Sequence, residues 1–136
     1  MPDTPKDAES KLRFKRVLIV DNEHTLRKLL VRNLKSSGHE IQEARTAAEA
    51  IAYTEKQEPD LILLDVNLPD RSGLDVLREL RTRGKKTPAI IISRTRIPKS
   101  RLEELKPMAY LPKPFPLEAL LRIVAGEPEE ARNSFD

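Results

Sequence analysis

The chain has 136 residues, a formal net charge of +3, 38% apolar and 35% charged residues, and no cysteine. This length suits one domain with a single core, and the composition is that of soluble globular proteins. No apolar run approaches the ~20 residues that span a bilayer, and no apolar stretch follows the charges of the N-terminus as in a secretory signal. The lack of cysteine excludes a disulfide framework, a thiolate metal site and a thiol nucleophile. We therefore expect a cytoplasmic protein that does not enter a membrane.

Residues 1–14 mix proline, charged residues and serine without periodicity, which predicts a disordered arm. A folded domain is expected over residues 15–126, and residues 127–136 are expected to form a tail or the start of a linker. Short apolar runs inside the domain indicate strands, several of them buried on both faces. The predicted strands are Val17–Val20, His39–Ala44, Asp60–Asp65, Ala89–Ser93 and Ala109–Leu111.

Helical patterns fill the segments between these strands. Leucines spaced as on one helix face begin after Thr25, and glycine supplies a left-handed stop at Gly38. Thr46 is expected to cap a second helix, because Glu49 three residues later completes a capping box. Three further helices are predicted from Leu74 to Gly84, from Pro98 to Pro107, and over Leu117–Val124.

Alternating strands and helices with short connections predict a parallel sheet covered by helices on both faces. In such sheets the ligand site lies beyond the carboxyl ends of the strands. Polar residues stand at these ends in the sequence and are therefore expected on one rim. They are Asp21, Asn22 and Glu23 after the first strand, Asp65 at the end of the third, and Ser93 at the end of the fourth.

Carboxylates gathered on one rim repel one another unless a cation lies between them. Oxygen ligands without histidine or cysteine suit a hard ion, Mg²⁺ above all. A carboxylate beside Mg²⁺ can attack phosphorus and form an aspartyl phosphate, for which Ser93 offers a hydroxyl and Lys113 a cation. Taken singly, each residue has a simpler role in a turn, a cap or the solvated surface. Their convergence on one rim favours the functional interpretation.

Four segments carry a resemblance that spans Val17 to Val124. They read VLIVDNE, LILLDVNLPDRSGLDVL, TPAIIIS and YLPKPF. Together they make the chain similar to the receiver domain of two-component response regulators. The resemblance implies a flavodoxin-like (βα)5 fold, a doubly wound parallel sheet with strand order 2-1-3-4-5, the order of chemotaxis receivers.

The resemblance also assigns the phosphorylation chemistry. Asp65 is the expected phosphoacceptor and takes its phosphoryl group from a sensor histidine kinase or a phosphotransfer protein. Mg²⁺ is the expected cofactor, and its expected ligands are Asp21, Asn22, Asp65 and the backbone carbonyl of Asn67.

A second group of residues is expected to act as the switch. By resemblance, the Ser93 hydroxyl moves towards the phosphoryl group, and Lys113 forms an ion pair there. Tyr110 is the aromatic residue that changes between exposed and buried positions as Ser93 moves. The bond between Lys113 and Pro114 is expected to be cis.

The sequence departs from the family pattern at three places. Asn22 replaces the second of two acids, which predicts weaker Mg²⁺ affinity and slower phosphorylation with the site still formed. Arg94 stands where a small residue is usual, and it could contact the phosphate, obstruct access or point into solvent. Pro107 and Met108 replace a common Ala-Gly-Ala turn, so the fourth helix is where we expect the structure to deviate.

Two functions from different classes remain open. The first is a switch that catalyses its own phosphorylation and dephosphorylation and presents its fourth helix, fifth strand and fifth helix to an output partner or fused effector domain. The second is a phosphorylation-independent interaction module with the same fold. A nucleotide-binding flavodoxin-like protein is disfavoured, because DNEHT and not a glycine-rich loop follows the first strand.

The expected partners exclude direct contact with nucleic acid. Eleven Lys or Arg residues lie between Arg71 and Lys106 against four acids, but no aromatic residue among them could stack on bases. Solvated helix faces explain this charge more simply. The chain is expected to be a stand-alone receiver or a fragment of a longer regulator, and a monomer or a weak phosphorylation-dependent dimer.

Overall fold

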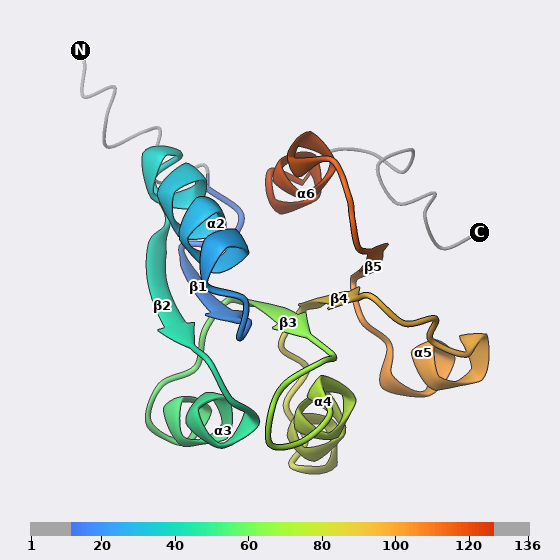
Figure 1. Ribbon diagram of the computed structural model, residues 1–136. Coiled ribbons are helices and arrows are strands. Elements are labelled where there is room, and N and C mark those ends of the chain that lie inside the picture. The colour runs from blue at the N-terminus through green and yellow to red at the C-terminus, as the bar shows by residue number, and fades with distance from the viewer. Residues whose placement is uncertain (1–11, 127–136) are drawn as a thin grey trace.

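The computed structural model describes residues 12–126, which form a five-stranded parallel sheet with helices on both faces (Figure 1). The strand order is β2-β1-β3-β4-β5, and every neighbouring pair is parallel. The predicted fold class and strand order are therefore confirmed. The strands are β1 (Arg16–Val20), β2 (Glu40–Ala44), β3 (Leu61–Asp65), β4 (Ala89–Ser93) and β5 (Ala109–Pro112).

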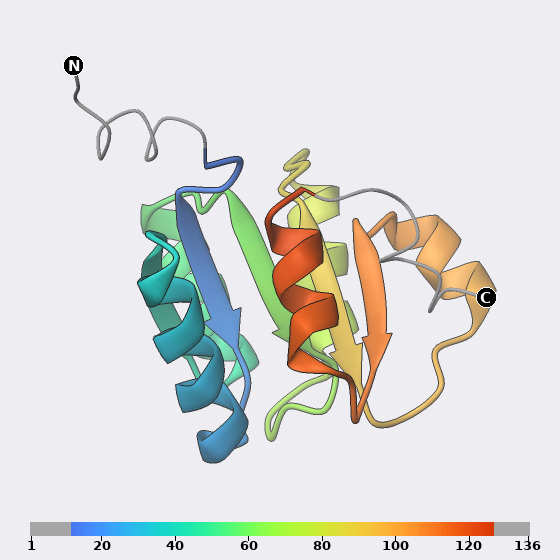
Figure 2. The same cartoon turned by 90° about the horizontal axis from the view of Figure 1, so that it is seen from above.

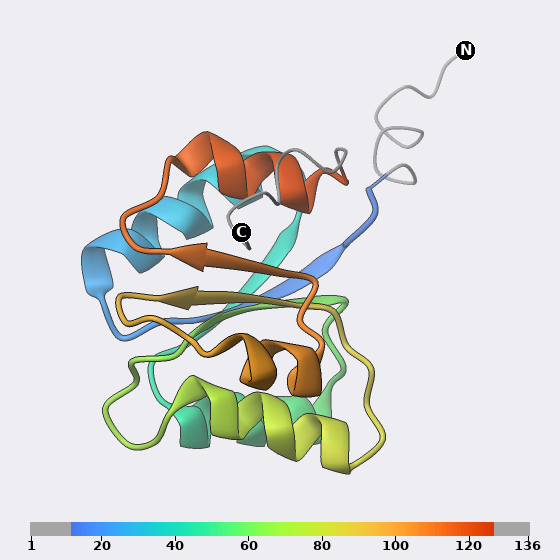
Figure 3. The same ribbon diagram turned by 90° about the vertical axis from the view of Figure 1, so that its right-hand side faces the viewer.

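One helix follows each strand, and the helices lie in two layers. In Figure 3 the sheet runs between α2 and α6 on one side and α4 and α5 on the other, while α3 lies next to α4 in Figure 1. None of these helices is both long and apolar enough to cross a membrane, over the residues described. The helices are α2 (His24–Ser36), α3 (Ala47–Lys56), α4 (Gly73–Thr82), α5 (Lys99–Leu105) and α6 (Leu117–Val124).

Two hydrophobic clusters hold these layers together, one on each face of the sheet. Alternate residues of β1 enter different clusters, with Leu18 on the α3–α4 side and Ile19 on the α2–α6 side. The three inner strands are buried on both faces except at Arg16, as the continuous apolar runs predict. Each fully buried Leu or Ile contributes roughly 1.5–3 kcal/mol to the stability of the fold. The packed sheet therefore holds the residues at its strand ends in fixed positions.

The packed structure extends beyond the expected N-terminal boundary. Phe14, assigned to the arm from sequence, is 4% exposed and packs into the cluster under α2 and α6. Its carbonyl also accepts a hydrogen bond from His39 Nδ1. The aromatic ring provides enough apolar area to order this residue despite its polar neighbours. Residues 1–11 of the predicted arm and the predicted tail, residues 127–136, lie outside the described residues.

The helix ends largely follow the predicted signals. Thr46 Oγ1 accepts the Glu49 N–H at 3.0 Å, but the return bond of the capping box comes from the Arg45 N–H. Gly38 adopts a left-handed φ of 100° after α2, as predicted. The apolar stripe of α2 differs, because Leu29 is 42% exposed while the charged Arg27 is buried.

The α5 segment is short. The helix has only seven residues, and it ends on Lys106, a non-glycine residue with a left-handed φ of 54°. The carbonyl groups at this end accept hydrogen bonds from the Arg81 guanidinium of α4, at 3.0 Å for Leu105 and 3.3 Å for Lys106. Arg81 also donates to the carbonyls of Lys85 and Thr87. One cation therefore ties the end of α5 to α4 and to the start of β4.

Replacing Arg81 with methionine is expected to lower the free energy of unfolding by about 2 kcal/mol, because the backbone carbonyls that accept from the guanidinium lose their charged donor. Amide hydrogen exchange should accelerate most in α5. Urea unfolding together with residue-resolved exchange measures both effects. A loss below about 0.5 kcal/mol, the scale of an ordinary surface substitution, would contradict this role for the guanidinium.

Candidate functional site

Three of the predicted site residues lie together at the carboxyl edge of the sheet, where the strand arrows end (Figure 2). Asp21 follows β1 directly, Asp65 ends β3, and Lys113 follows β5. The Lys113 ammonium lies 3.1 Å from Asp65 Oδ2 and 3.4 Å from Asp21 Oδ2. It also lies 3.2 Å from Glu23 Oε1. We call this cluster of Asp21, Glu23, Asp65 and Lys113 the acidic site.

Lys113 stays charged in this position. Its side chain is 7% exposed, and the peptide bond that follows it to Pro114 is cis, as the resemblance implies. Burial alone would lower the pKa of the amine, but the charges of Asp21 and Asp65 outweigh burial and raise the pKa above its ordinary value. The ammonium is therefore a permanent cation between two carboxylates.

The two aspartates are buried and unequally satisfied. Asp65 Oδ1 accepts the Asn67 N–H at 2.9 Å, and Asp65 Oδ2 accepts from Lys113. Asp21 Oδ1 accepts the Glu23 N–H at 2.8 Å. Asp21 Oδ2 is buried without a hydrogen-bond partner among residues 12–126, although the Lys113 ammonium is within ion-pair distance.

This arrangement raises the pKa of Asp21 from 3.8 to about 6. Burial is the largest cause, the backbone hydrogen bond from Glu23 opposes it, and the negative charge of Asp65 adds to it. Lys113 lowers the pKa but compensates only one of the two buried negative charges. The acidic site therefore carries more negative charge than its own cation balances.

The chemistry of the donor set fits Mg²⁺. A buried carboxylate oxygen without a hydrogen-bond partner stands beside a second carboxylate, and both are hard ligands. Residues 12–126 contain no cluster of three or more Asp, Glu, His or Cys residues arranged to hold a metal. A magnesium ion here would be held by Asp21, Asp65, the Asn67 carbonyl and the Asn22 amide together with water, because Mg²⁺ commonly keeps several waters. The fourth predicted ligand, Asn22, is exposed.

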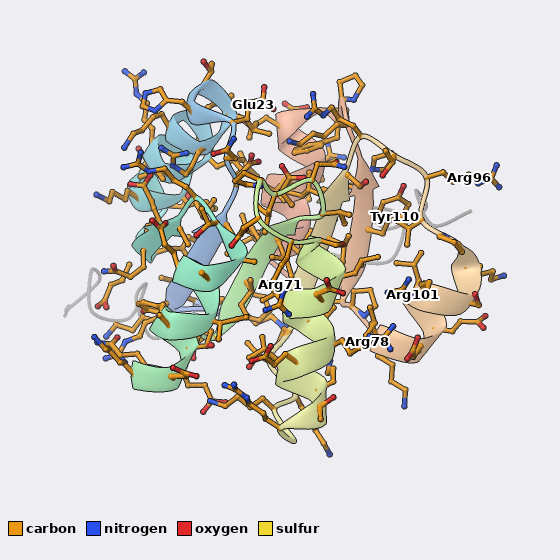
Figure 4. The ribbon with its side chains drawn as sticks, turned by 60° about the horizontal axis from the view of Figure 1, so that its bottom comes forward. Glu23, Arg71, Arg78, Arg96, Arg101 and Tyr110 are labelled. Atoms are coloured by element: carbon orange, nitrogen blue, oxygen red, sulfur yellow. The ribbon has the colours of Figure 1, made fainter. Side chains whose placement is uncertain are left out.

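The hydroxyl of Ser93 points to its own loop. Ser93 is 1% exposed, and its Oγ lies 2.7 Å from the Thr95 carbonyl oxygen, to which it donates. The Thr95 N–H in turn donates to Ser93 Oγ at 2.9 Å. Tyr110, which projects from β5 on the α5 side of the sheet (Figure 4), is 9% exposed and also donates to the Thr95 carbonyl. Thr95 thus joins the two predicted switch residues, a contact that sequence reasoning missed.

Arg94 lies at the mouth of the site without a fixed side-chain contact. Its side chain is exposed and makes no hydrogen bond or ion pair with residues 12–126, while its backbone N–H donates to Asn67 Oδ1 at 3.1 Å. The guanidinium borders a hollow of about 510 Å³. The hollow is lined by Glu23, Leu26, Arg94, Lys113, Pro114 and Phe115.

Gly73 shapes the site through its backbone and was also missed as a functional residue. It is the first residue of α4, and an added Cβ atom would lie 2.2 Å from the backbone oxygen of Asp65. Such a distance is impossible without moving the main chain. A glycine directly after the serine that caps a helix is the only sequence signal for this close approach.

The raised pKa of Asp21 predicts a stability change with pH. Between pH 4 and pH 6 the folded protein holds a proton on Asp21 that the unfolded chain has lost, so stability falls as pH rises through this window. At pH 8, without metal, the charge on Asp21 is expected to cost on the order of 3 kcal/mol, at ~1.4 kcal/mol per pKa unit. Asp21→Asn should therefore raise the free energy of unfolding at pH 8 and flatten its dependence on pH. Urea unfolding at both pH values measures this, and a less stable variant at pH 8 would contradict it.

Comparison with known proteins agrees with the geometry. The family model described as the response regulator receiver domain matches residues 17–125. The response regulator MprA of Mycobacterium ulcerans (strain Agy99) is 35% identical over 128 residues, which cover 88% of this chain and 55% of that protein. MprA of Mycobacterium leprae (strain TN) is 33% identical over 126 residues, with the same coverage. The chain spans about half the length of these relatives.

Solved structures are similar over most of the chain. The CheY-like receiver domain protein of Methanospirillum hungatei JF-1 has a TM-score of 0.76 at 26% identity, and the match covers 88% of this chain and 98% of that one. The response regulator TrrA of Thermotoga maritima, solved in complex with Mg²⁺-BeF, has a TM-score of 0.72 at 33% identity over 81% and 96% of the two chains. The chain belongs to the receiver domain family of two-component response regulators.

Proposed function

We propose that this receiver domain accepts a phosphoryl group on Asp65 from a histidine kinase or phosphotransfer protein in a Mg²⁺-dependent reaction. The observation that carries the proposal is the excess negative charge of the acidic site. Asp21 Oδ2 is buried without a hydrogen bond next to Asp65, whose own Oδ2 contacts the Lys113 ammonium. The similarity to TrrA, which was solved with Mg²⁺-BeF, supports a magnesium ion at the corresponding place.

In the proposed reaction, a carboxylate oxygen of Asp65 forms a bond to phosphorus while the bond from phosphorus to the donor breaks. The Lys113 ammonium lies within 3.1 Å of that carboxylate and is placed to stabilise the charge that moves onto the phosphoryl oxygens. Asp21, Asn22 and the Asn67 carbonyl would hold Mg²⁺ together with Asp65. When bound, the ion supplies charge neutralisation for the phosphoryl oxygens.

The proposed switch depends on the hydrogen bonds that the Thr95 carbonyl accepts from Ser93 and Tyr110. Phosphorylation adds charge and acceptor oxygens at Asp65, which favour a donor from Ser93. Ser93 would then exchange its bond to Thr95 for one to the phosphoryl group, and Tyr110, bonded to the same carbonyl, would respond. The proposed output is a changed affinity of the α5–β5–α6 face for its partner. Arg94, which lines the hollow beside Lys113, is proposed to contact the phosphoryl group.

The proposal names the partners of the domain only by class. We infer an output protein or a fused effector domain, since the chain spans about half of its relatives. The proposal includes no direct nucleic-acid contact and no membrane. The proposed assembly state is a monomer or a weak phosphorylation-dependent dimer. Histidine kinases draw on ATP, so the proposed location is the cytoplasm. The domain would catalyse its own phosphorylation and dephosphorylation.

The second candidate function is a phosphorylation-independent interaction module. Two observations favour it, the exposed amide at Asn22 in place of an acid and the seven-residue α5. The intact contact between Asp65 and Lys113 favours the switch. The two functions make opposite predictions for magnesium and a phosphoryl mimic.

Backbone NMR separates these functions. We expect Mg²⁺ to shift the amide signals of Glu23 and Asn67, and beryllofluoride added with Mg²⁺ to shift those of Thr95 and Tyr110 as well. Asp65→Asn should abolish the beryllofluoride response. Spectra that stay unchanged with both additions would favour the interaction module.

A further inference from the structure

A buried arginine lies directly behind the acidic site. Arg27, in the first turn of α2, is 4% exposed, and its guanidinium bonds groups from two other elements. Nη1 donates to the Asp21 carbonyl at 2.9 Å, and Nε donates to Glu43 Oε1 of β2 at 2.8 Å. Nη2 lies 3.3 Å from His24 Nδ1. No step of the proposed reaction uses this side chain.

These bonds fix the backbone of the residue that carries the unsatisfied carboxylate oxygen. The Asp21 N–H donates to the Ala44 carbonyl of β2 at 3.0 Å, and the Asp21 carbonyl accepts from Arg27. Glu43, which holds the guanidinium, directly precedes Ala44. Arg27 of α2 is therefore hydrogen-bonded both to the residue after β1 and to β2, on either side of Asp21. These bonds leave the Asp21 carboxylate little freedom to rotate.

Stability alone does not require a charged residue here. Arg27 is buried but its partner Glu43 is exposed, and an ion pair with a solvent-exposed partner typically contributes little to stability, so the pair is weak evidence for a stabilising role. Burial pushes the pKa of Glu43 upward, but hydrogen bonds from Arg27 and Lys28 outweigh burial and lower it overall. Glu43 is therefore ionised at neutral pH, and the acceptor of the guanidinium on the rim side is the Asp21 carbonyl.

We propose that Arg27 is a positioning residue for the cation site, which holds Asp21 in the orientation that binds Mg²⁺ and permits phosphorylation of Asp65. The inference rests on the proposed function. It matters in this chain because Asn22 is an exposed amide, so Asp21 is the buried carboxylate that faces Asp65. Partners that orient metal ligands typically change metal affinity by roughly 10–100-fold when they are removed.

The test compares Arg27→Met with Arg81→Met. Arg81 is a matched control, because its guanidinium also bonds backbone carbonyls within the fold, but at the ends of α4 and α5. Mg²⁺ affinity is measured from the amide shifts of Asn67, and the rate of Asp65 phosphorylation from acetyl phosphate. Arg27→Met is expected to weaken Mg²⁺ binding by roughly 10-fold or more and to slow phosphorylation, whereas Arg81→Met leaves both unchanged.

A third variant tests the proposal even if Arg27→Met does not fold. Arg27→Lys keeps the charge but can reach only one of the two acceptors, so it should lose part of the Mg²⁺ affinity while it remains folded. Mg²⁺ affinity within twofold of the parent chain in a folded Arg27 variant would overturn the positioning role. Failure of the parent chain itself to bind Mg²⁺ would instead overturn the proposed function, so the two failures are distinguishable.

Discussion

Lys113→Met is expected to reduce the rate of Asp65 phosphorylation by roughly 10²–10³-fold, the usual effect of removing one preorganised donor from a site of charge transfer. Lys113 is the cation of the acidic site, within 3.4 Å of both buried aspartates. Its removal should also strengthen Mg²⁺ binding, because the ion no longer competes with an ammonium for the same carboxylates. Acetyl phosphate kinetics and Mg²⁺ titration measure the two opposite changes.

The same substitution has a predictable effect on stability. Two buried carboxylates without a cation repel each other, and removing one partner of a buried pair costs roughly 3–5 kcal/mol when the remaining charge persists. Without Lys113, which lowers it, the pKa of Asp21 rises further, so the folded state binds a proton more readily and the loss grows as pH increases. Lys15→Met, which removes an exposed lysine 3.9 Å from Glu40, is the control and should change little. Weaker Mg²⁺ binding in Lys113→Met would contradict the assignment of competing cations.

Gly73→Ala is expected to be the most damaging of the four Gly→Ala substitutions that the chain allows. The added Cβ would lie 2.2 Å from Asp65 O and 3.0 Å from Val66 Cα, both backbone atoms that cannot rotate away. Either α4 or the end of β3 must move. We expect a loss of about 3 kcal/mol or more, at the upper end for overpacking, together with weaker Mg²⁺ binding because Asp65 is displaced. Urea unfolding and Mg²⁺ titration measure the two effects.

Gly84→Ala is the matched control for this substitution. Gly84 has a left-handed φ of 81°, but an added Cβ would meet nothing within 4 Å. Its cost is therefore the backbone strain alone, about 1 kcal/mol. Mg²⁺ affinity should stay at the parent value. If Gly73→Ala were no more destabilising than Gly84→Ala, the inference that the close approach of α4 to β3 requires glycine at position 73 would be wrong.

The parts of the site that depend only on strand direction could be predicted from sequence. Asp21, Asp65 and Ser93 end predicted parallel strands, so a shared rim follows from the fold. The Lys113 contact could be expected once its strand was placed at the sheet edge. Asn22 is exposed next to the buried Asp21, and its role as a magnesium ligand stays a prediction.

Contacts that depend on loop paths could not be predicted. The bonds of Thr95 arise from how the chain turns after β4, and no periodic pattern records that turn. The leucine spacing of α2 likewise predicts a buried apolar stripe, but it does not determine which residues lie at the centre of that stripe. The structure buries the polar Arg27 and exposes Leu29, because the guanidinium bonds the Asp21 carbonyl, just after β1, and the Glu43 carboxylate of β2. Phe14 is similar, since its packing against α2 and α6 overrides the polar composition around it.

The most direct test of the central claim is the intact mass of the protein after incubation with Mg²⁺ and acetyl phosphate. We expect the mass of one added phosphoryl group, which should be absent in Asp65→Ala and absent when Mg²⁺ is chelated. That result would establish the acidic site as a phosphoacceptor and show that Asn22 is tolerated beside it. An unchanged mass, or an adduct that survives in Asp65→Ala, would contradict the account and favour an interaction module that keeps the fold without the chemistry.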